Sequence, residues 1–273
     1  MKKIDCHTHI INDTIRNAYF SRADHIALVM QFPETILSNP DTVRTVQSDP
    51  RLFLCPCIDR KAPIAPQLAQ IEAHLDDWKV VGLKIYTSYQ QGTAEDPEME
   101  EVYAFAEANR LAVTFHTGLC SLVLPSDQDL EGSSALHIAR AAERHPGVNF
   151  VAAHMDDPHT ARCCRLCADH PNLFTDFSGL FEEGYESDWN VLLKQYGDAV
   201  SCISSTGSVT VRNPIASQIL FGTDFCPPLN LVDIERFDRF LEELFSPQEL
   251  QAIYYENPLR AFPRLADHLK EDR

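Results

Sequence analysis

Eight short apolar runs alternate along the chain with longer polar or amphipathic stretches, and this alternation constrains the fold more than any other feature. Short apolar runs are typical of buried strands. Parallel strands need a long crossover between them, so strands that alternate with helices predict a parallel sheet. The predicted strands are Lys3–Thr8, His25–Met30, Leu52–Cys57, Val80–Tyr86, Ala112–His116, Val148–His154, Leu173–Asp176 and Gln218–Thr223.

The stretches between most of these strands have the apolar spacing of helices. Asp96 is a candidate N-cap for one helix, and Ser134 begins another that His145-Pro146-Gly147 would end. The predicted helices are Ala65–Trp78, Pro97–Ala108, Ser134–Arg144, Thr160–Asp169, Glu186–Tyr196, Ile234–Leu244 and Pro247–Glu256.

The number of strands and the length of 273 residues predict an α/β fold in which residues 1–273 form a single (β/α)8 TIM barrel. No linker, repeat or low-complexity segment divides the chain. The alternative is a doubly wound open sheet. No glycine-rich phosphate loop follows the first strand, however, and the 10 glycines form no G-x-G-x-x-G motif.

Composition excludes some functions. The net charge of −17 argues against a nucleic-acid partner or an anionic membrane surface, because both attract basic patches. No apolar run approaches the roughly 20 residues of a membrane span. The nine cysteines are an odd number with no apolar signal segment ahead of them, so we expect reduced thiols and a cytoplasmic protein. Cys163, Cys164 and Cys167 sit on a predicted helix without a second half-site, which indicates packing or surface thiols.

Residues able to bind a metal close several of the predicted strands. In Asp5-x-His7-x-His9, alternate side chains of a strand share one face, so the two imidazoles converge and form half of a transition-metal site. In a barrel the C-terminal strand ends meet at one rim, where active sites lie. The residues that close the strands are His7 and His9, Lys84 and Tyr86, His116, His154, and Asp224.

This constellation resembles the amidohydrolase superfamily of metal-dependent barrel enzymes, and more narrowly its amidohydrolase 2 branch. The resemblance spans almost the whole chain and includes an ending similar to Asn-x-x-Arg-x-Phe at residues 257–262. It implies a lactonase, decarboxylase or hydratase. It also implies that the metal is held by His7, His9, His116 and Asp224, with His154 binding the substrate or a second metal.

Lys84 bears on the number of metal ions. In dinuclear relatives a fourth-strand lysine is carboxylated and bridges two metals, and Lys84 in Gly-Leu-Lys-Ile-Tyr is similar to that motif. Sites of the amidohydrolase 2 branch are often mononuclear. We therefore expect one divalent metal with Lys84 near it or near the substrate, and a second metal on a carboxylated Lys84 stays open. Imidazole with carboxylate suits Zn²⁺, with Mn, Fe or Ni as alternatives.

These roles predict hydrolysis of an amide, lactone or ester bond in a small organic substrate. A metal-activated water would lose its proton to Asp224 as general base, and His154 would stabilise the oxyanion. The alternative is non-oxidative decarboxylation of an aromatic or unsaturated acid, which the compact loops disfavour. A third alternative, a barrel that binds without catalysis, is disfavoured because all five expected ligand positions are filled.

The predicted substrate-binding residues are Lys84, Tyr86, Arg16 and His154. Arg16, with Arg60, would supply cations to an otherwise apolar pocket and suit a small organic acid. The apolar stretch Leu119–Pro125 has two interpretations, as a loop that lines the pocket or as a surface that seats a second subunit in a homodimer.

Overall fold

The computed structural model describes residues 1–118, 129–183, 188–201 and 215–271, and it confirms the predicted barrel with all eight strands in their predicted order. Most strands are shorter than predicted. The strands are β1 (Ile4–Thr8), β2 (Ile26–Met30), β3 (Leu52–Cys55), β4 (Gly82–Ile85), β5 (Ala112–Phe115), β6 (Phe150–Ala152), β7 (Leu173–Asp176) and β8 (Ile219–Leu220).

All paired strands are parallel, and they form one three-stranded sheet, β1-β2-β3, and one five-stranded sheet, β4 to β8. Two irregular seams join the sheets into a barrel. At the first seam the amide of Val81 donates to the carbonyl of Leu54 at 2.9 Å. At the second seam the amide of Cys6 donates to the carbonyl of Phe221 at 2.8 Å. The barrel therefore closes between β3 and β4 and between β8 and β1.

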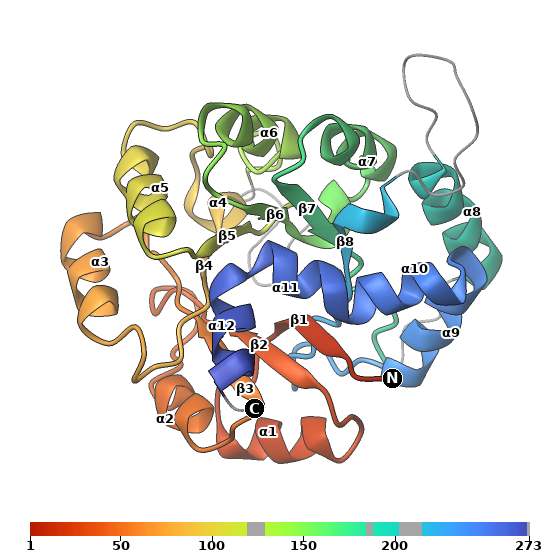
Figure 1. Ribbon diagram of the computed structural model, residues 1–273, viewed down its shortest axis with the longest axis horizontal. Coiled ribbons are helices and arrows are strands. Elements are labelled where there is room, and N and C mark those ends of the chain that lie inside the picture. The colour runs from red at the N-terminus through yellow and green to blue at the C-terminus, as the bar shows by residue number, and fades with distance from the viewer. Residues whose placement is uncertain (119–128, 184–187, 202–214, 272–273) are drawn as a thin grey trace.

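Helices surround the strands (Figure 1). The longer ones are α1 (Asp13–Phe20), α3 (Ile64–Ala73), α5 (Met99–Ala108), α6 (Ala135–Arg144), α7 (Thr160–Asp169), α8 (Trp189–Val200), α9 (Ile234–Leu244) and α12 (Pro263–Glu271). The shorter ones are α2 (Thr42–Gln47), α4 (Thr87–Gln90), α10 (Pro247–Gln251), the π-helix η4 (Ala252–Glu256), α11 (Asn257–Ala261), and the 3-10 helices η2 (Ala153–Asp156) and η3 (Ala216–Gln218).

Two local predictions have different outcomes. Ser134 caps α6 as predicted, because its side chain accepts a hydrogen bond from the amide of Leu136. The prediction that Asp96 caps the next helix upstream is wrong. The Asp96 carboxylate accepts instead from Thr93 and Arg60, and α5 begins later, after Glu98.

The barrel interior is filled by inward-facing strand residues and is closed at one end by the C-terminal helices. Phe262 is completely buried, and together with Ala261 and Leu265 it packs against the inward-facing strand residues. Asn257 fastens the segment, since its amide donates to the carbonyls of Ala216 at 2.7 Å and Ile219 at 2.8 Å. In Figure 1, α11 and α12 cross the face of the barrel near β1 and β2. The Asn-x-x-Arg-x-Phe ending is thus a structural plug at the end opposite the strand C-termini.

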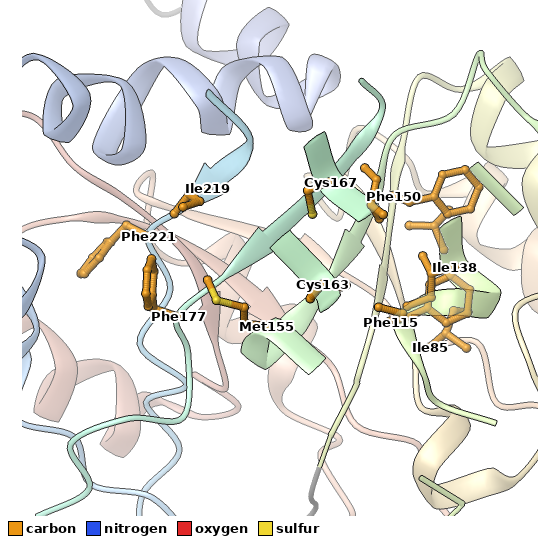
Figure 2. Packing of buried hydrophobic residues seen from close by; sticks show 14 of the residues in the cluster. Ile85, Phe115, Ile138, Phe150, Met155, Cys163, Cys167, Phe177, Ile219 and Phe221 are labelled. Carbon is orange, nitrogen blue, oxygen red and sulfur yellow. The ribbon is translucent and has the colours of Figure 1, made fainter. Parts of the chain in front are cut away.

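A second apolar layer lies between the strands and the outer helices. Figure 2 shows Ile219, Phe177, Met155, Phe150 and Phe115 in this layer, with thiols of α7 among them. The three α7 thiols Cys163, Cys164 and Cys167 are fully buried. Their prediction as packing thiols is therefore supported.

Two further expectations from the sequence concern membrane spans and the apolar stretch Leu119–Pro125. Within the described residues, no helix has both the length and the apolar character that crossing a bilayer requires. The whole apolar stretch at residues 119–125, predicted to be a pocket loop or a dimer surface, lies outside the residues that the structure describes.

Candidate metal centre

His7 on β1 and His9 just after it are held so that the same ring atom of each faces Asp224. The Nδ1 atom of His9 lies 2.7 Å from the carbonyl oxygen of Met30, the last residue of β2. The Nδ1 atom of His7 lies 3.2 Å from a carboxylate oxygen of Asp176 at the end of β7. Each acceptor draws the ring proton to Nδ1, which leaves Nε2 with a lone pair for a metal.

Burial keeps these imidazoles neutral. Desolvation, with the charge of Lys84 as a second cause, lowers the pKa of His7 to about 3. Desolvation also lowers the pKa of His9. Neutral imidazole is the form that binds metal, so both side chains are ready to bind without losing a proton at neutral pH.

Asp224 supplies the third group from the seam beside β8. Its φ of 63° is left-handed, a conformation that costs a residue with a side chain about 1–2 kcal/mol. Its Oδ1 lies 3.1 Å from His9 Nε2 and 3.6 Å from His7 Nε2. Burial on its own raises the pKa of Asp224. The imidazoles of His9, His7 and His154 act in the opposite direction and hold that pKa below its usual value.

The donor set fits a divalent transition metal. His7, His9 and Asp224 each offer one ligand atom, and these atoms lie within 4.8 Å of one another. Ligands about 2.0–2.1 Å from a tetrahedral zinc ion are roughly 3.4 Å apart. The separations of 3.1 and 3.6 Å from Asp224 Oδ1 lie on either side of that value. Two imidazole lone pairs and a carboxylate facing one another repel, and a cation between them would remove the repulsion.

Lys84 lies beside this group rather than in the open pocket. Its Nζ is 3.1 Å from His7 Nε2, and the side chain is completely buried. Desolvation lowers the pKa of Lys84 to about 8, while the carboxylates of Asp176 and Asp224 act in the opposite direction. The predicted substrate-binding lysine therefore contacts His7, a candidate metal ligand.

Asp176 and Ser178 are site residues that the sequence analysis missed. Asp176 also accepts hydrogen bonds from the His154 amide at 2.9 Å and the Ser178 amide at 3.0 Å. The Ser178 hydroxyl lies 3.0 Å from Nδ1 of His7 and 2.8 Å from Nδ1 of His154. His7, His154 and Asp176 form a second group with metal-binding geometry. The donors that converge on Asp176 make it an orienting carboxylate. The sequence could have indicated Asp176, because this residue closes the seventh predicted strand as the other candidate residues close theirs.

His116 and His154 lie next to each other. His116 Nδ1 is 3.1 Å from His154 Nε2, and the rings of His154 and His7 have centroids 4.8 Å apart. His154 and the two residues after it all have left-handed φ angles, which turn the chain sharply at the end of β6. His116 belongs to neither group with metal-binding geometry. Its role as a fourth ligand remains a prediction.

A small pocket of about 30 Å³ opens over the candidate ligands. Tyr86 lies in its wall, and the buried Tyr86 hydroxyl has no hydrogen-bond partner among the described residues. Phe32 stacks on His9 with ring centroids 4.0 Å apart. The pocket is lined by His9, Phe32, Tyr86, Tyr89, His116, Asp224, Cys226, Leu229 and Asn230.

The structure does not bring Arg16 to this pocket. Arg16 lies on α1, where it pairs with Asp13 at 3.1 Å and donates to the Ser48 hydroxyl at 2.5 Å. Arg60 pairs with Asp96 and Glu98. The prediction that Arg16 binds the substrate therefore loses its support, because both arginines are held by partners outside the pocket.

Solved structures with the same fold include enzymes of two reaction types. A probable 2-pyrone-4,6-dicarboxylic acid hydrolase from Acinetobacter baumannii, with citric acid bound, is 13% identical, with a TM-score of 0.64 over 96% of this chain and 100% of that one. A 2,6-dihydroxybenzoate decarboxylase from Rhizobium is 13% identical, with a TM-score of 0.61 over 96% and 99%. An amidohydrolase from Burkholderia multivorans with bound zinc is 17% identical, with a TM-score of 0.61 over 96% and 99%.

A search of curated protein sequences found no match. A model of the amidohydrolase family, in contrast, matches residues 42–264, which is more than half of the chain. The matched region includes Lys84, His116, His154, Asp176 and Asp224, and the barrel puts them at the same rim as His7 and His9. The chain therefore belongs to the amidohydrolase family and is an enzyme with a candidate His/Asp metal site.

Proposed function

We propose that this enzyme hydrolyses an amide, lactone or ester bond of a small organic substrate and uses one divalent metal ion, with zinc as the preferred ion. The observation that carries the proposal is the shared orientation of His7 and His9. Both rings direct Nδ1 to a fixed acceptor, and Nε2 of each lies within reach of the same Asp224 oxygen.

His7, His9 and Asp224 would hold the ion, and His116 is the proposed fourth ligand. A metal bound there supplies a Lewis acid that polarises a carbonyl oxygen and lowers the pKa of water. Zinc is present in one similar structure, the amidohydrolase from Burkholderia multivorans. Histidine with carboxylate is a donor set that suits the same ion here.

Asp224 is the proposed general base. Its pKa lies well below the usual value, so the carboxylate is ionised at neutral pH and has an oxygen available to accept a proton from water. Oδ2 of Asp224 accepts from the side-chain amide (Nδ2) of Asn230 at 3.4 Å, whereas Oδ1 faces the histidines. This division lets one oxygen serve the metal while the other faces the pocket.

His154 and Tyr86 are proposed to act on the substrate. His154 is partly exposed at the rim and would stabilise negative charge that develops on the carbonyl oxygen. The Tyr86 hydroxyl, which has no partner in the part of the chain that the structure describes, is costly to bury, and a substrate oxygen that accepts from it would remove that cost. Lys84 is proposed to act indirectly, through its contact with His7. We therefore expect a small substrate with an oxygen acceptor beside its scissile bond.

Decarboxylation of an aromatic or unsaturated acid is the second candidate. It is favoured by the 2,6-dihydroxybenzoate decarboxylase among the similar structures and by the aromatic residues Phe32, Tyr86 and Tyr89 in the pocket wall. Flat rings pack well against such side chains.

The test is a panel of lactones, aryl esters, cyclic amides and aromatic carboxylic acids, assayed with zinc-loaded and metal-free protein. Proton release reports hydrolysis of lactones and esters, chromatographic detection of the ring-opened acid reports hydrolysis of cyclic amides, and carbon dioxide release reports decarboxylation. We expect zinc-dependent hydrolysis that falls about 10²- to 10⁴-fold in Asp224→Asn. The control Asp24→Asn changes a carboxylate whose side chain is 89% exposed and should retain full activity. Carbon dioxide release without hydrolysis would replace the proposal with the second candidate.

A further inference from the structure

We propose that Asp5 and Thr223 are positioning residues that hold the metal-binding ends of β1 and β8 in register. The inference rests on the proposed metal site, because its consequence is the relative position of His7 and Asp224. Neither Asp5 nor Thr223 is among the residues that line the pocket, so both would act through the residues they hold.

The Asp5 carboxylate is a meeting point of donors from three segments. Its Oδ1 accepts from the amide of His7 at 3.2 Å and from the amide of Thr223 at 3.0 Å. Its Oδ2 accepts from the Thr223 hydroxyl at 2.7 Å and from the Tyr19 hydroxyl of α1 at 2.9 Å. The residue is completely buried. A carboxylate is the side chain that accepts four hydrogen bonds in so small a space.

The contact between Asp5 and Thr223 lies where regular strand pairing does not fix the chain. β8 has only two residues, Ile219 and Leu220, and the chain that follows it does not continue as a regular strand. Backbone hydrogen bonds to β1 continue irregularly, with the Asp224 amide donating to the His7 carbonyl at 2.8 Å. A left-handed Asp224 follows directly after Thr223. The grip on Thr223 therefore fixes the position from which Asp224 turns towards the histidines.

The Asp5 carboxylate thus fixes the positions of two proposed ligands, His7 and Asp224. On one side it holds the backbone of His7, and on the other it holds Thr223 through both amide and hydroxyl. The separations of 3.1 and 3.6 Å between the ligand atoms leave little tolerance, since metal–ligand bonds vary by only about 0.2 Å. Loosening the Thr223 contact should lower metal affinity before it unfolds the barrel.

The first test compares zinc affinity, measured by competition with a chromophoric chelator, in the full-length wild type, Thr223→Val and Thr223→Ser. Valine keeps the shape and removes the hydroxyl, while serine keeps the hydroxyl. We expect Thr223→Val to bind zinc about 10- to 100-fold more weakly, and Thr223→Ser to stay within about threefold of wild type.

Thr42→Val is the matched control. Thr42 is equally buried, and its hydroxyl donates at 2.9 Å to the Asn39 carbonyl beside α2. This variant should lose stability in metal-free denaturation but keep the wild-type zinc affinity. An equal loss of zinc affinity in Thr42→Val would mean that affinity merely follows stability, and the positioning role would be overturned.

A second pair of variants keeps the test decisive if Thr223→Val does not fold. Tyr19→Phe removes the remaining side-chain donor to Asp5. Tyr103→Phe removes an equally buried hydroxyl that donates at 2.5 Å to the Ala94 carbonyl. We expect weaker zinc binding only in Tyr19→Phe. Wild-type affinity in both Thr223→Val and Tyr19→Phe would overturn the positioning role and leave the metal site intact. Absence of zinc binding in the wild type would overturn both.

Discussion

Gly222 offers a sharp test of how closely β8 and β1 must approach. A Cβ atom at this position would lie 3.0 Å from His7 Cβ and 3.4 Å from the Asp176 side chain. Carbon atoms pack comfortably at about 3.5–4.0 Å, so Gly222→Ala must displace His7 or its strand by about 0.5–1 Å. Overpacking of this kind costs about 1–3 kcal/mol. Because the displaced residue is a proposed ligand, we expect zinc affinity to fall about 10- to 100-fold, which is roughly 1.4–2.8 kcal/mol.

The assay is urea denaturation of metal-free protein together with chelator competition for zinc. Gly197→Ala in α8 is the control, since among the described residues a Cβ there meets only a methyl group of Leu244, at an ordinary 3.5 Å. That substitution should leave zinc affinity unchanged and should not destabilise the helix, because alanine favours a helix more than glycine does. If Gly222→Ala matched the wild type within about twofold in zinc affinity and kept its stability, the argument from close approach would be refuted.

Three further predictions follow from single contacts. Asp176→Asn should weaken zinc binding about 10- to 100-fold in the chelator assay, because it weakens the acceptor that orients His7, and unchanged affinity would contradict this role. Phe262→Ala should lower the free energy of unfolding by about 3–5 kcal/mol in urea and leave the zinc affinity of the folded protein unchanged, because Phe262 plugs the end of the barrel away from the site. Burial, with the charge of Lys3 as a second cause, lowers the pKa of His25 to about 4. The unfolded chain therefore takes up this proton first as pH falls below about 6.5, and up to about 3 kcal/mol of stability should be lost between pH 6.5 and 4. His25→Gln should reduce that loss in metal-free denaturation at pH 7 and 4.5, and an identical loss in both proteins would contradict the assignment.

The barrel was predictable because its strands are buried on both faces and read as short apolar runs. The ends of the strands were less predictable. β6 stops at Ala152 because His154 and the two residues after it are left-handed; the Asp157-Pro158 pair signals a turn nearby but does not show at which residue the strand ends. Helix α1 is not among the predicted helices, although Asn12 accepts a hydrogen bond from the Ile15 amide as a capping residue does.

The candidate site was predictable where a residue closes a strand, as His7, His9 and Asp224 do. The same rule would have found Asp176 if an acidic residue at a strand end had been considered as an orienting group. Arg16 was misplaced because charge alone does not show which way a side chain points. On a helix, Asp13 is three residues away and lies on the same face, and this pairing turns Arg16 from the pocket.

The most direct test of the central claim is metal content per chain, measured by mass spectrometry on protein purified without added metal. We predict about one zinc ion per chain in the wild type and loss of that ion in a His7→Ala/His9→Ala variant. Two ions per chain would contradict the mononuclear site and assign Lys84 a bridging role. No bound metal, even after reconstitution with zinc, would contradict the proposed centre itself.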